Sequence, residues 1–393
     1  MATTIERTSP EGLGAAAPAL LSLAAAAFVA VTTEMLPVGL LPDIGAAFAV
    51  PESVIGLLVS LYAVMVAALA VPLTLLTARF ARKPLLLATL AGYVVSNAMV
   101  AAAPVFAVVA VGRTLGGLTH ALFFSLLIGY TPRLVSRAHL GRALSLVSGG
   151  ASAGLVLGVP LSTSLGTAIG WRAAFAVLAG VAALTFVLVC LLLPGVENGP
   201  PGHTGDSVGR GALAAVAASN TLTFLGHFTL YTFITLVLLG SGIAPAMVGP
   251  ILLVCGACGL ISLWYAGRNL DRNPRRTVVV IFAVFIGAIV ALGGTWPAGV
   301  AVVVAAIAWN GAFGAVPSIY QTHAVRTHAV TPELAGAWVN ATANVGIAGG
   351  AAIGAGLLDS AGIWVLPWVS VALIGLGLLV ILMSPRAFPS RAG

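Results

Sequence analysis

The chain has 393 residues, of which 60% are hydrophobic and 7% charged, and its mean hydropathy is +1.11. Soluble domains carry about 25% charged residues, so this composition excludes a soluble globular protein and predicts a polytopic membrane protein. The net charge of +7 does not indicate nucleic-acid binding, because the basic residues are confined almost entirely to loops on one side of the predicted membrane.

Twelve apolar segments are long enough to cross a membrane as helices. About 20 apolar residues suffice, because ~30 Å of hydrocarbon is crossed at ~1.5 Å per residue. The segments are apolar on every face, whereas barrel strands alternate apolar and polar residues, so we predict an all-α membrane protein. The predicted cores are residues 15–41, 53–76, 84–103, 105–130, 142–166, 173–193, 212–239, 246–266, 277–294, 298–320, 334–358 and 362–383.

The basic residues predict the orientation of these spans. Fifteen of the 17 lie in the two tails or in loops that join an even-numbered span to the next odd one, Arg172 lies in a loop on the opposite side, and Arg113 lies within a span. An excess of Lys and Arg marks the cytoplasmic side. We therefore expect both termini to be cytoplasmic, no cleaved signal peptide, and a bacterial cytoplasmic (inner) membrane location.

Two similar halves are expected on either side of a polar linker. We predict a six-helix bundle over residues 1–193, a linker over 194–211 and a second bundle over 212–393. Several matched positions share one offset: 275 − 82, 249 − 56 and 364 − 171 all equal 193. Parallel repeats of this kind are typical of transporters that bind substrate between two halves. Glu34 and His227 are also separated by 193 residues.

The loop Gly267-Arg-Asn-Leu-Asp271-Arg272-Asn-Pro-Arg275-Arg276 resembles the G-x-x-x-D-R-x-x-R-R/K signature of the major facilitator superfamily. The first-half loop keeps Arg79, Arg82 and Lys83, but Thr74 and Ala78 replace the Gly and Asp. The resemblance implies that these loops close a cytoplasmic gate, although solvated charges that only orient the chain would give the same pattern. Asp271 is the only acid in the two loops.

Two further segments carry the same resemblance. Arg113-Thr-Leu-Gly-Gly117 is similar to the R-x-x-x-G pattern of the fourth span, and Gly154, Gly158 and Pro160 loosely resemble the antiporter motif of the fifth. Small residues one turn apart and a proline favour a kink and close helix contact, which we expect at the interface between the halves. The resemblance implies a major facilitator fold of two pseudo-symmetric six-helix bundles, with spans one, four, seven and ten around a central cavity.

Glu34 is an ionisable residue inside the first apolar span, and such residues usually face a protein interior or a water-filled cavity. With the expected orientation, Glu34 and Arg113 lie ~10 Å and ~12 Å below the outer boundary, so the two side chains could meet or alternate. The proton affinity of Glu34 would then depend on Arg113 and on water, as proton-coupled antiport requires. The alternative is a purely structural bridge. We assign proton coupling to Glu34, Arg113 and His227.

Other polar residues within spans predict the substrate cavity. His120 lies seven residues after Arg113, on the same helix face. Trp309 and Asn310 lie near mid-depth in the tenth span, where an amide beside an aromatic ring suits a sugar or nucleoside. Asn344 lies four residues after Asn340 in the eleventh span. For each of these residues, a hydrogen bond that merely joins helices is the competing interpretation.

The stretches TTEMLPVGLLPDI and GVPLSTSLGTAIGWRAAF resemble bacterial twelve-span efflux permeases, in the groups that export sugars, nucleosides or amphenicol-type drugs. The resemblance implies export of a small organic solute of one of these classes, and with Glu34 as the titratable group we predict a proton-coupled secondary transporter. A proton-coupled uptake symporter is the alternative, and a membrane sensor or an intramembrane enzyme is more distant. No G-x-x-x-x-G-K-[ST] motif occurs, which excludes ATP drive within this chain. We expect no enzyme activity and no cofactor beyond the proton gradient. The expected partners are the solute, protons and lipid, without nucleic acid, and we expect a monomer.

Overall fold

A computed structural model of the chain describes residues 13–77, 80–135, 140–195, 207–270, 272–330 and 332–389. Helices form the first half, joined by short loops. A 3-10 turn (Thr131–Arg133) follows the fifth helix, and a π-helical turn (Gly154–Gly158) joins the sixth to the seventh. The helices are α1 (Leu13–Gly39), α2 (Leu41–Phe48), α3 (Glu52–Leu76), α4 (Arg82–Ala101), α5 (Phe106–Tyr130), α6 (Leu140–Ala153), α7 (Val159–Ile169) and α8 (Trp171–Leu192).

The second half repeats this arrangement. Its helices are α9 (Ser207–Tyr231), α10 (Ile234–Gly240), α11 (Pro245–Asn269), α12 (Pro274–Thr295), α13 (Gly299–Phe313), α14 (Val316–Arg326), α15 (Pro332–Ser360) and α16 (Leu366–Met383). The described residues contain twelve helical stretches that are long and apolar enough to cross a membrane. Three of these stretches combine two helices: α6 with α7, α9 with α10, and α13 with α14. The prediction of a twelve-span, all-α membrane protein is confirmed.

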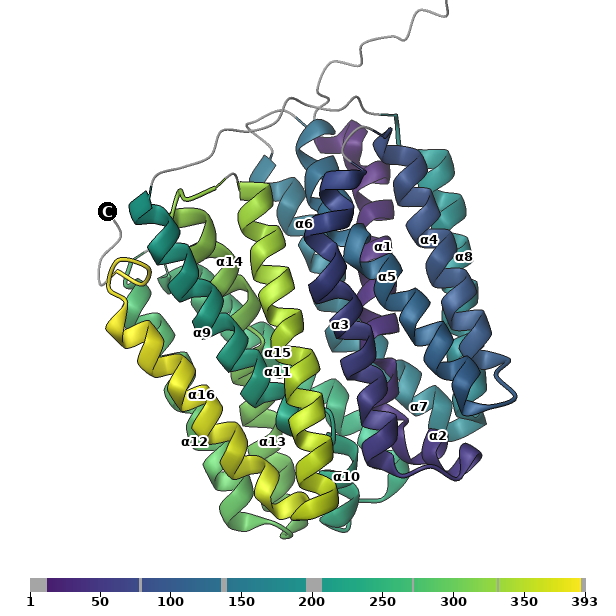
Figure 1. Cartoon of the computed structure of the whole chain (residues 1–393), viewed down its shortest axis with the longest axis vertical. Coiled ribbons are helices and arrows are strands. Elements are labelled where there is room, and N and C mark those ends of the chain that lie inside the picture. The colour runs from purple at the N-terminus through teal and green to yellow at the C-terminus, as the bar shows by residue number, and fades with distance from the viewer. Residues whose placement is uncertain are drawn as a thin grey trace, which may run out of the picture.

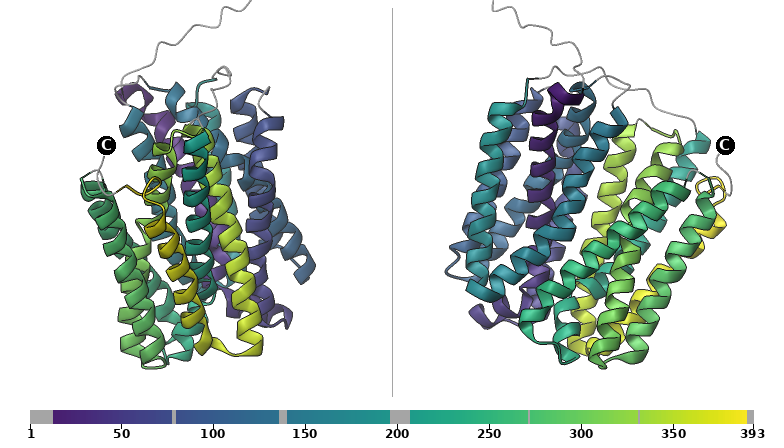
Figure 2. Two further views of the ribbon diagram at one scale, coloured as in Figure 1. Left: turned by 60° about the vertical axis from the view of Figure 1, so that its left-hand side comes forward. Right: turned by 180° about the vertical axis from the view of Figure 1, so that it is seen from behind.

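The two halves lie side by side, with α1–α8 on one side and α9–α16 on the other (Figure 1). The view from behind shows the same division (Figure 2). We call the end where α1 and α9 begin the linker end and the opposite end, with α2 and α10, the far end. Odd-numbered spans run from the linker end to the far end, and even-numbered spans return.

The internal repeat is visible in the backbone. The first span breaks at Leu40, with φ −121° and ψ 15°, and the seventh breaks at Phe233, with φ −108° and ψ 17°. The two positions differ by 193 (233 − 40), the offset found in the sequence. In each half the break leads into a short helix at the far end, α2 or α10. Two sequences with different side chains therefore adopt the same local backbone at matched positions.

The halves touch mainly through two helix pairs, α3 with α15 and α7 with α11. Ser60 Oγ donates to the Ala348 carbonyl oxygen at 2.8 Å, and Thr235 Oγ1 donates to the Val38 carbonyl oxygen at 2.9 Å. Gly249 also packs closely against Ser164. These residues all lie in the far-end part of their spans. The structure therefore shows a state in which the halves are joined at the far end.

The glycines of the fifth span differ from expectation in one respect. A Cβ at Gly154 or at Gly158 would collide with Phe28 or Thr32 of α1, so both glycines allow close packing within their own half rather than between the halves. The opposite side of the segment does reach the second half, because Gly256 of α11 packs on Val156. The predicted irregularity is present as the π-helical turn before Pro160, whose ring cannot supply an amide hydrogen.

Candidate functional site

Glu34 lies in α1 near the far end and is buried, with 7% of its surface exposed. One carboxylate oxygen, Oε1, has no hydrogen-bond partner among the described residues. The other, Oε2, lies 3.7 Å from His120 Nε2. A buried carboxylate with an unpaired oxygen is costly, so this group favours either a proton or a bound water.

Arg113 binds the backbone beside Glu34 instead of its carboxylate. The guanidinium donates to the carbonyl oxygens of Thr33 and Glu34 at 2.5 and 2.7 Å, and its carbon lies 4.3 Å from the centre of the Tyr62 ring. Glu34 and Arg113 are therefore in contact as expected, but Arg113 contacts the backbone of Glu34 and not its side chain. The geometric reason is that the fork of the guanidinium matches two successive carbonyls of α1. Arg113 still places a positive charge near the carboxylate.

His120 belongs to the Glu34 cluster, although we expected it in the substrate cavity. It is buried, with 1% of its surface exposed, and its Nδ1 lies 3.0 Å from the Tyr62 hydroxyl oxygen. The imidazole thus connects Glu34 of α1 to Tyr62 of α3. Its ring also meets Tyr93 edge-on, with centroids 6.3 Å apart.

A fourth helix, α4, completes this cluster through Tyr93 and Asn97. Asn97 Nδ2 donates to Thr33 Oγ1 at 3.0 Å and to the Tyr93 carbonyl oxygen at 2.9 Å. Like Glu34 Oε1, the Tyr93 hydroxyl, Asn97 Oδ1 and Arg113 Nε are buried without partners among the described residues. Four unpaired polar atoms in one cluster mark a site for water or protons in an otherwise apolar interior.

The second half holds an aromatic cluster at the matched positions. His227 takes the place of Glu34, and Phe313 takes the place of His120, since 227 − 34 and 313 − 120 both equal 193. The His227 and Phe313 rings stack with centroids 3.5 Å apart and planes 4° from parallel. Trp309 Nε1 donates to His227 Nδ1 at 3.1 Å. Because indole can only donate, His227 Nδ1 is an acceptor, and the ring is neutral in this state.

The other predicted cavity residues do not converge on one point in this state. Trp309 is fully buried and points its N–H at His227. Asn310 donates to the Ala306 carbonyl oxygen at 2.9 Å, within its own helix. Asn344 donates to the Asn340 carbonyl oxygen at 3.0 Å, and its buried Oδ1 has no partner among the described residues.

The basic loops lie at the linker end. Lys83 Nζ donates to the Cys190 carbonyl oxygen at 2.9 Å, and Arg275 donates to the Leu382 carbonyl oxygen at 2.7 Å. Each cation thus binds the last turn of the final span of its half, where helix carbonyls lack partners. Arg79 and Asp271 lie outside the described residues. The remaining loop residues are exposed or partly exposed: Arg82, Gly267, Arg272 and Arg276.

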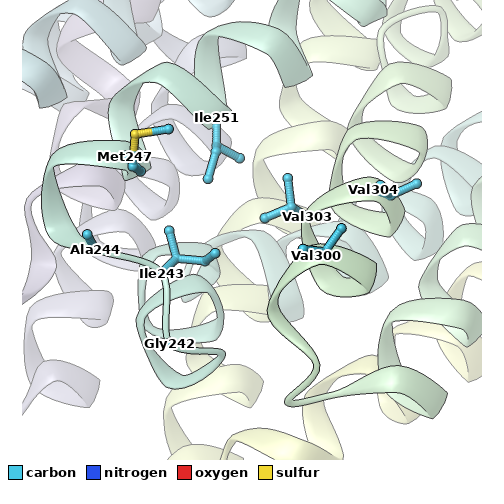
Figure 3. A pocket seen from close by; sticks show the side chains of 8 residues that line it. All are labelled: Gly242, Ile243, Ala244, Met247, Ile251, Val300, Val303 and Val304. Atoms are coloured by element: carbon cyan, nitrogen blue, oxygen red, sulfur yellow. The ribbon is translucent and has the colours of Figure 1, made fainter.

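A surface pocket of about 320 Å³ opens at the far end between α11, α13 and the loop that joins α10 to α11. Its lining includes Ile243, Met247, Ile251 and Val303, and Figure 3 shows apolar side chains around it. It presents no group that could bind a proton or orient a polar solute. Among the described residues, no three His, Cys, Asp or Glu side chains come together as metal ligands.

Three residues of the Glu34 cluster were missed by the sequence analysis: Tyr62, Tyr93 and Asn97. A signal for them exists, because each is a polar side chain within a predicted apolar span. Buried tyrosine hydroxyls and amides normally require partners, so these residues are candidates for a shared network. Their distance along the chain from Glu34 gives no indication that they meet it.

Comparisons with known proteins agree with this architecture. The chain is 32% identical to a chloramphenicol efflux pump of Mycobacterium tuberculosis, over 93% of this chain and 92% of the relative. It is 29% identical to a "probable sugar efflux transporter" of Mannheimia succiniciproducens, over 89% of each chain.

Solved structures show the same fold at low sequence identity. A D-xylose–proton symporter superposes with a TM-score of 0.73 at 14% identity, covering 95% of this chain and 98% of the symporter. A bacterial homologue of the human lysosomal transporter Spinster, in an inward-facing and unoccupied conformation, gives a TM-score of 0.71 at 13% identity, covering 96% and 98%. The family model of the Major Facilitator Superfamily matches residues 23–331. With twelve spans and two matched halves, the chain belongs to the Major Facilitator Superfamily of membrane transporters.

Proposed function

We propose that this transporter exports a small organic solute from the bacterial cytoplasm in exchange for protons, with Glu34 as the proton carrier. The observation that carries the proposal is the buried Glu34 carboxylate, which has one unpaired oxygen and the other facing His120. A carboxylate buried in this way is stabilised by binding a proton. Arg113 provides a nearby positive charge that opposes protonation, so the group can release the proton when water reaches it.

The proposal of export is supported by relatives that are named a chloramphenicol efflux pump and a probable sugar efflux transporter. An amphenicol is the first solute to test, and sugars and nucleosides are the next. The distribution of basic residues supports an inner-membrane location with the linker end in the cytoplasm. In that orientation, the halves are joined on the outer side, and the state is the one that receives solute from the cytoplasm.

Alternating access supplies the coupling. While the halves are joined at the far end, Glu34 is closed off from the outer side, so the proton bound there leaves toward the cytoplasm. The transporter then binds solute from the cytoplasm while the Glu34 carboxylate is deprotonated. When the halves rock to open the far end, the solute leaves, and Glu34 takes up a new proton from outside. Because Glu34 is protonated in one step and deprotonated in the other, the inward movement of a proton and the outward movement of the solute occur in separate steps of the cycle.

The test uses proteoliposomes with an imposed pH gradient and labelled chloramphenicol. Proton-driven movement of the drug against the direction of the protons supports antiport, and movement with the protons identifies the symport alternative. Glu34→Gln should abolish the driven movement while the protein still inserts and folds. Glu52→Gln is the matched control, because it makes the same chemical change at the far-end start of α3. Normal pH-driven transport by Glu34→Gln would refute the proposal.

A further inference from the structure

We propose that Tyr62 is a positioning residue for proton coupling, and that Tyr62, His120 and Glu34 form a relay in which protonation of Glu34 inverts the tautomer of His120. The inference rests on the proposed role of Glu34 as the proton carrier. It assigns a task to a tyrosine that the sequence motifs do not mark, and it connects the proton site to the contact between the two halves.

The geometry places one imidazole between a carboxylate and a phenol. His120 Nε2 lies 3.7 Å from Glu34 Oε2, and Nδ1 lies 3.0 Å from the Tyr62 oxygen. A neutral imidazole carries a hydrogen on one nitrogen and a lone pair on the other. When Glu34 is ionised, the favourable tautomer has Nε2–H directed at the carboxylate. Nδ1 is then the acceptor, and the Tyr62 O–H donates to it.

Adding one proton reverses the donor and acceptor of each hydrogen bond between Glu34, His120 and Tyr62. A protonated Glu34 carries a hydrogen that His120 Nε2 can accept, so the imidazole hydrogen must lie on Nδ1. Nδ1–H then donates to the Tyr62 oxygen, and the Tyr62 O–H must find another acceptor. The balance is complete: as a proton arrives at Tyr62, its former hydrogen passes to Nδ1, and the Nε2 hydrogen passes to Glu34. No other reactant is needed.

Tyr93 provides the acceptor that the reversed state requires. Its hydroxyl is buried without a hydrogen-bond partner among the described residues, and the Tyr93 and Tyr62 rings both meet the His120 ring edge-on, with centroids 6.3 and 5.4 Å from it. The remaining polar groups around the relay are Arg113 from α5, over the Tyr62 ring, and Asn97 from α4. Arg113 is held by backbone carbonyls in the structure and leaves the Glu34 carboxylate free to exchange its proton with His120.

The position of Tyr62 on α3 connects this relay to the second half. Two residues before it, Ser60 donates to the Ala348 carbonyl oxygen of α15 across the interface. On the other side, Gly116 and Gly117 of α5 pack directly against Tyr62, so that a Cβ at Gly117 would lie 2.5 Å from the Tyr62 carbonyl oxygen. A reversal of the hydrogen bond at Tyr62 therefore acts on a helix that is tightly held between the proton site and the interface.

Histidine tautomers can be measured directly, which gives the inference a readout besides transport. The full-length protein is labelled with 15N-histidine, and the His120 signal is assigned by comparison with His120→Gln. We expect the hydrogen to lie on Nε2 at high pH and on Nδ1 once Glu34 is protonated. Glu34→Gln should abolish this pH-dependent conversion.

Tyr62→Phe keeps the ring under Arg113 but removes the hydroxyl. We expect Glu34 to titrate still, the exchange between the two His120 tautomers to slow because the proton path through Tyr62 is lost, and proton-driven transport to fall about 100-fold, the lower end of the range for loss of a proton-transferring group. Tyr320→Phe is the matched control, since its buried hydroxyl donates to the Ser219 carbonyl oxygen within the second half. It should leave both readouts unchanged.

The outcomes separate the two proposals. If no titration disappears in Glu34→Gln, the proposed function fails. If Glu34 titrates but His120 keeps one tautomer throughout, only the relay is overturned. Tautomer exchange as fast in Tyr62→Phe as in the unaltered protein also overturns the role of Tyr62. Should Tyr62→Phe fail to fold, the tautomer of the unaltered protein across the Glu34 titration still decides the relay.

Discussion

Gly117→Ala is a demanding test of how α5 is packed against α3. The added Cβ would lie 2.5 Å from the Tyr62 carbonyl oxygen and 2.8 Å from Met65 Cβ. Contacts under 3.0 Å are essentially absent around real Cβ atoms, and comfortable contact begins at 3.4 Å, so α3 must retreat by about 0.9 Å (3.4 − 2.5). The obstacle is helix backbone, which cannot rotate away as a side chain can.

Overpacking of this kind costs about 1–3 kcal/mol. Replacing a helical glycine by alanine returns about 0.5–1 kcal/mol through lower chain entropy. The two ranges leave a net cost of about 0–2.5 kcal/mol, so we expect Gly117→Ala to lower the free energy of unfolding by about 1 kcal/mol. We also expect proton-driven efflux to fall, because the shift moves Tyr62 relative to His120.

The assay combines reversible unfolding in mixed micelles with drug efflux in proteoliposomes. Gly180→Ala is the matched control, because nothing lies within 4 Å of a Cβ built at that helical glycine. It should be neutral or slightly stabilising. If the two alanine variants behave alike in stability and transport, the close approach of α5 to α3 does not have the role that we assign to it.

Two further predictions concern the linker end. Lys83→Ala and Arg275→Ala should each lower the thermal stability only slightly, because a charge at a helix end contributes about 0.3–1 kcal/mol. The two effects should add in the double variant, since the sites lie in different halves. A clear departure from additivity would show that the two contacts are not independent. Phe388→Ala should release the C-terminal tail and expose it to proteolysis, because burial of this completely buried ring contributes about 1.5–3 kcal/mol. The exposed neighbour Arg386→Ala should digest like the unaltered protein, and equal digestion of both variants would show that the ring does not hold the tail.

The sequence by itself determined the class of the fold and the repeat. Apolar runs of about 20 residues have one solution in a bilayer, because every backbone group must be satisfied within the segment. For that reason the twelve predicted spans match the helices of the structure closely. The shared offset of 193 was also readable, and it reappears in the matched breaks at Leu40 and Phe233. Glu34 was evident as well, since an acid in an apolar span is conspicuous without any structure.

Only the tertiary structure decided what Glu34 meets. His120 was expected beside the solute, yet it lies against the carboxylate, and Arg113 binds carbonyls instead of the acid. Tyr62 and Tyr93 went unnoticed as members of the same cluster. The physical reason is that helical periodicity shows which residues share a face of one helix, but it does not show the rotation of that helix against its neighbours. In this protein the helices approach one another closely at glycines such as Gly117 of α5, which packs against Tyr62 and Met65 of α3, more than 50 residues away in the chain.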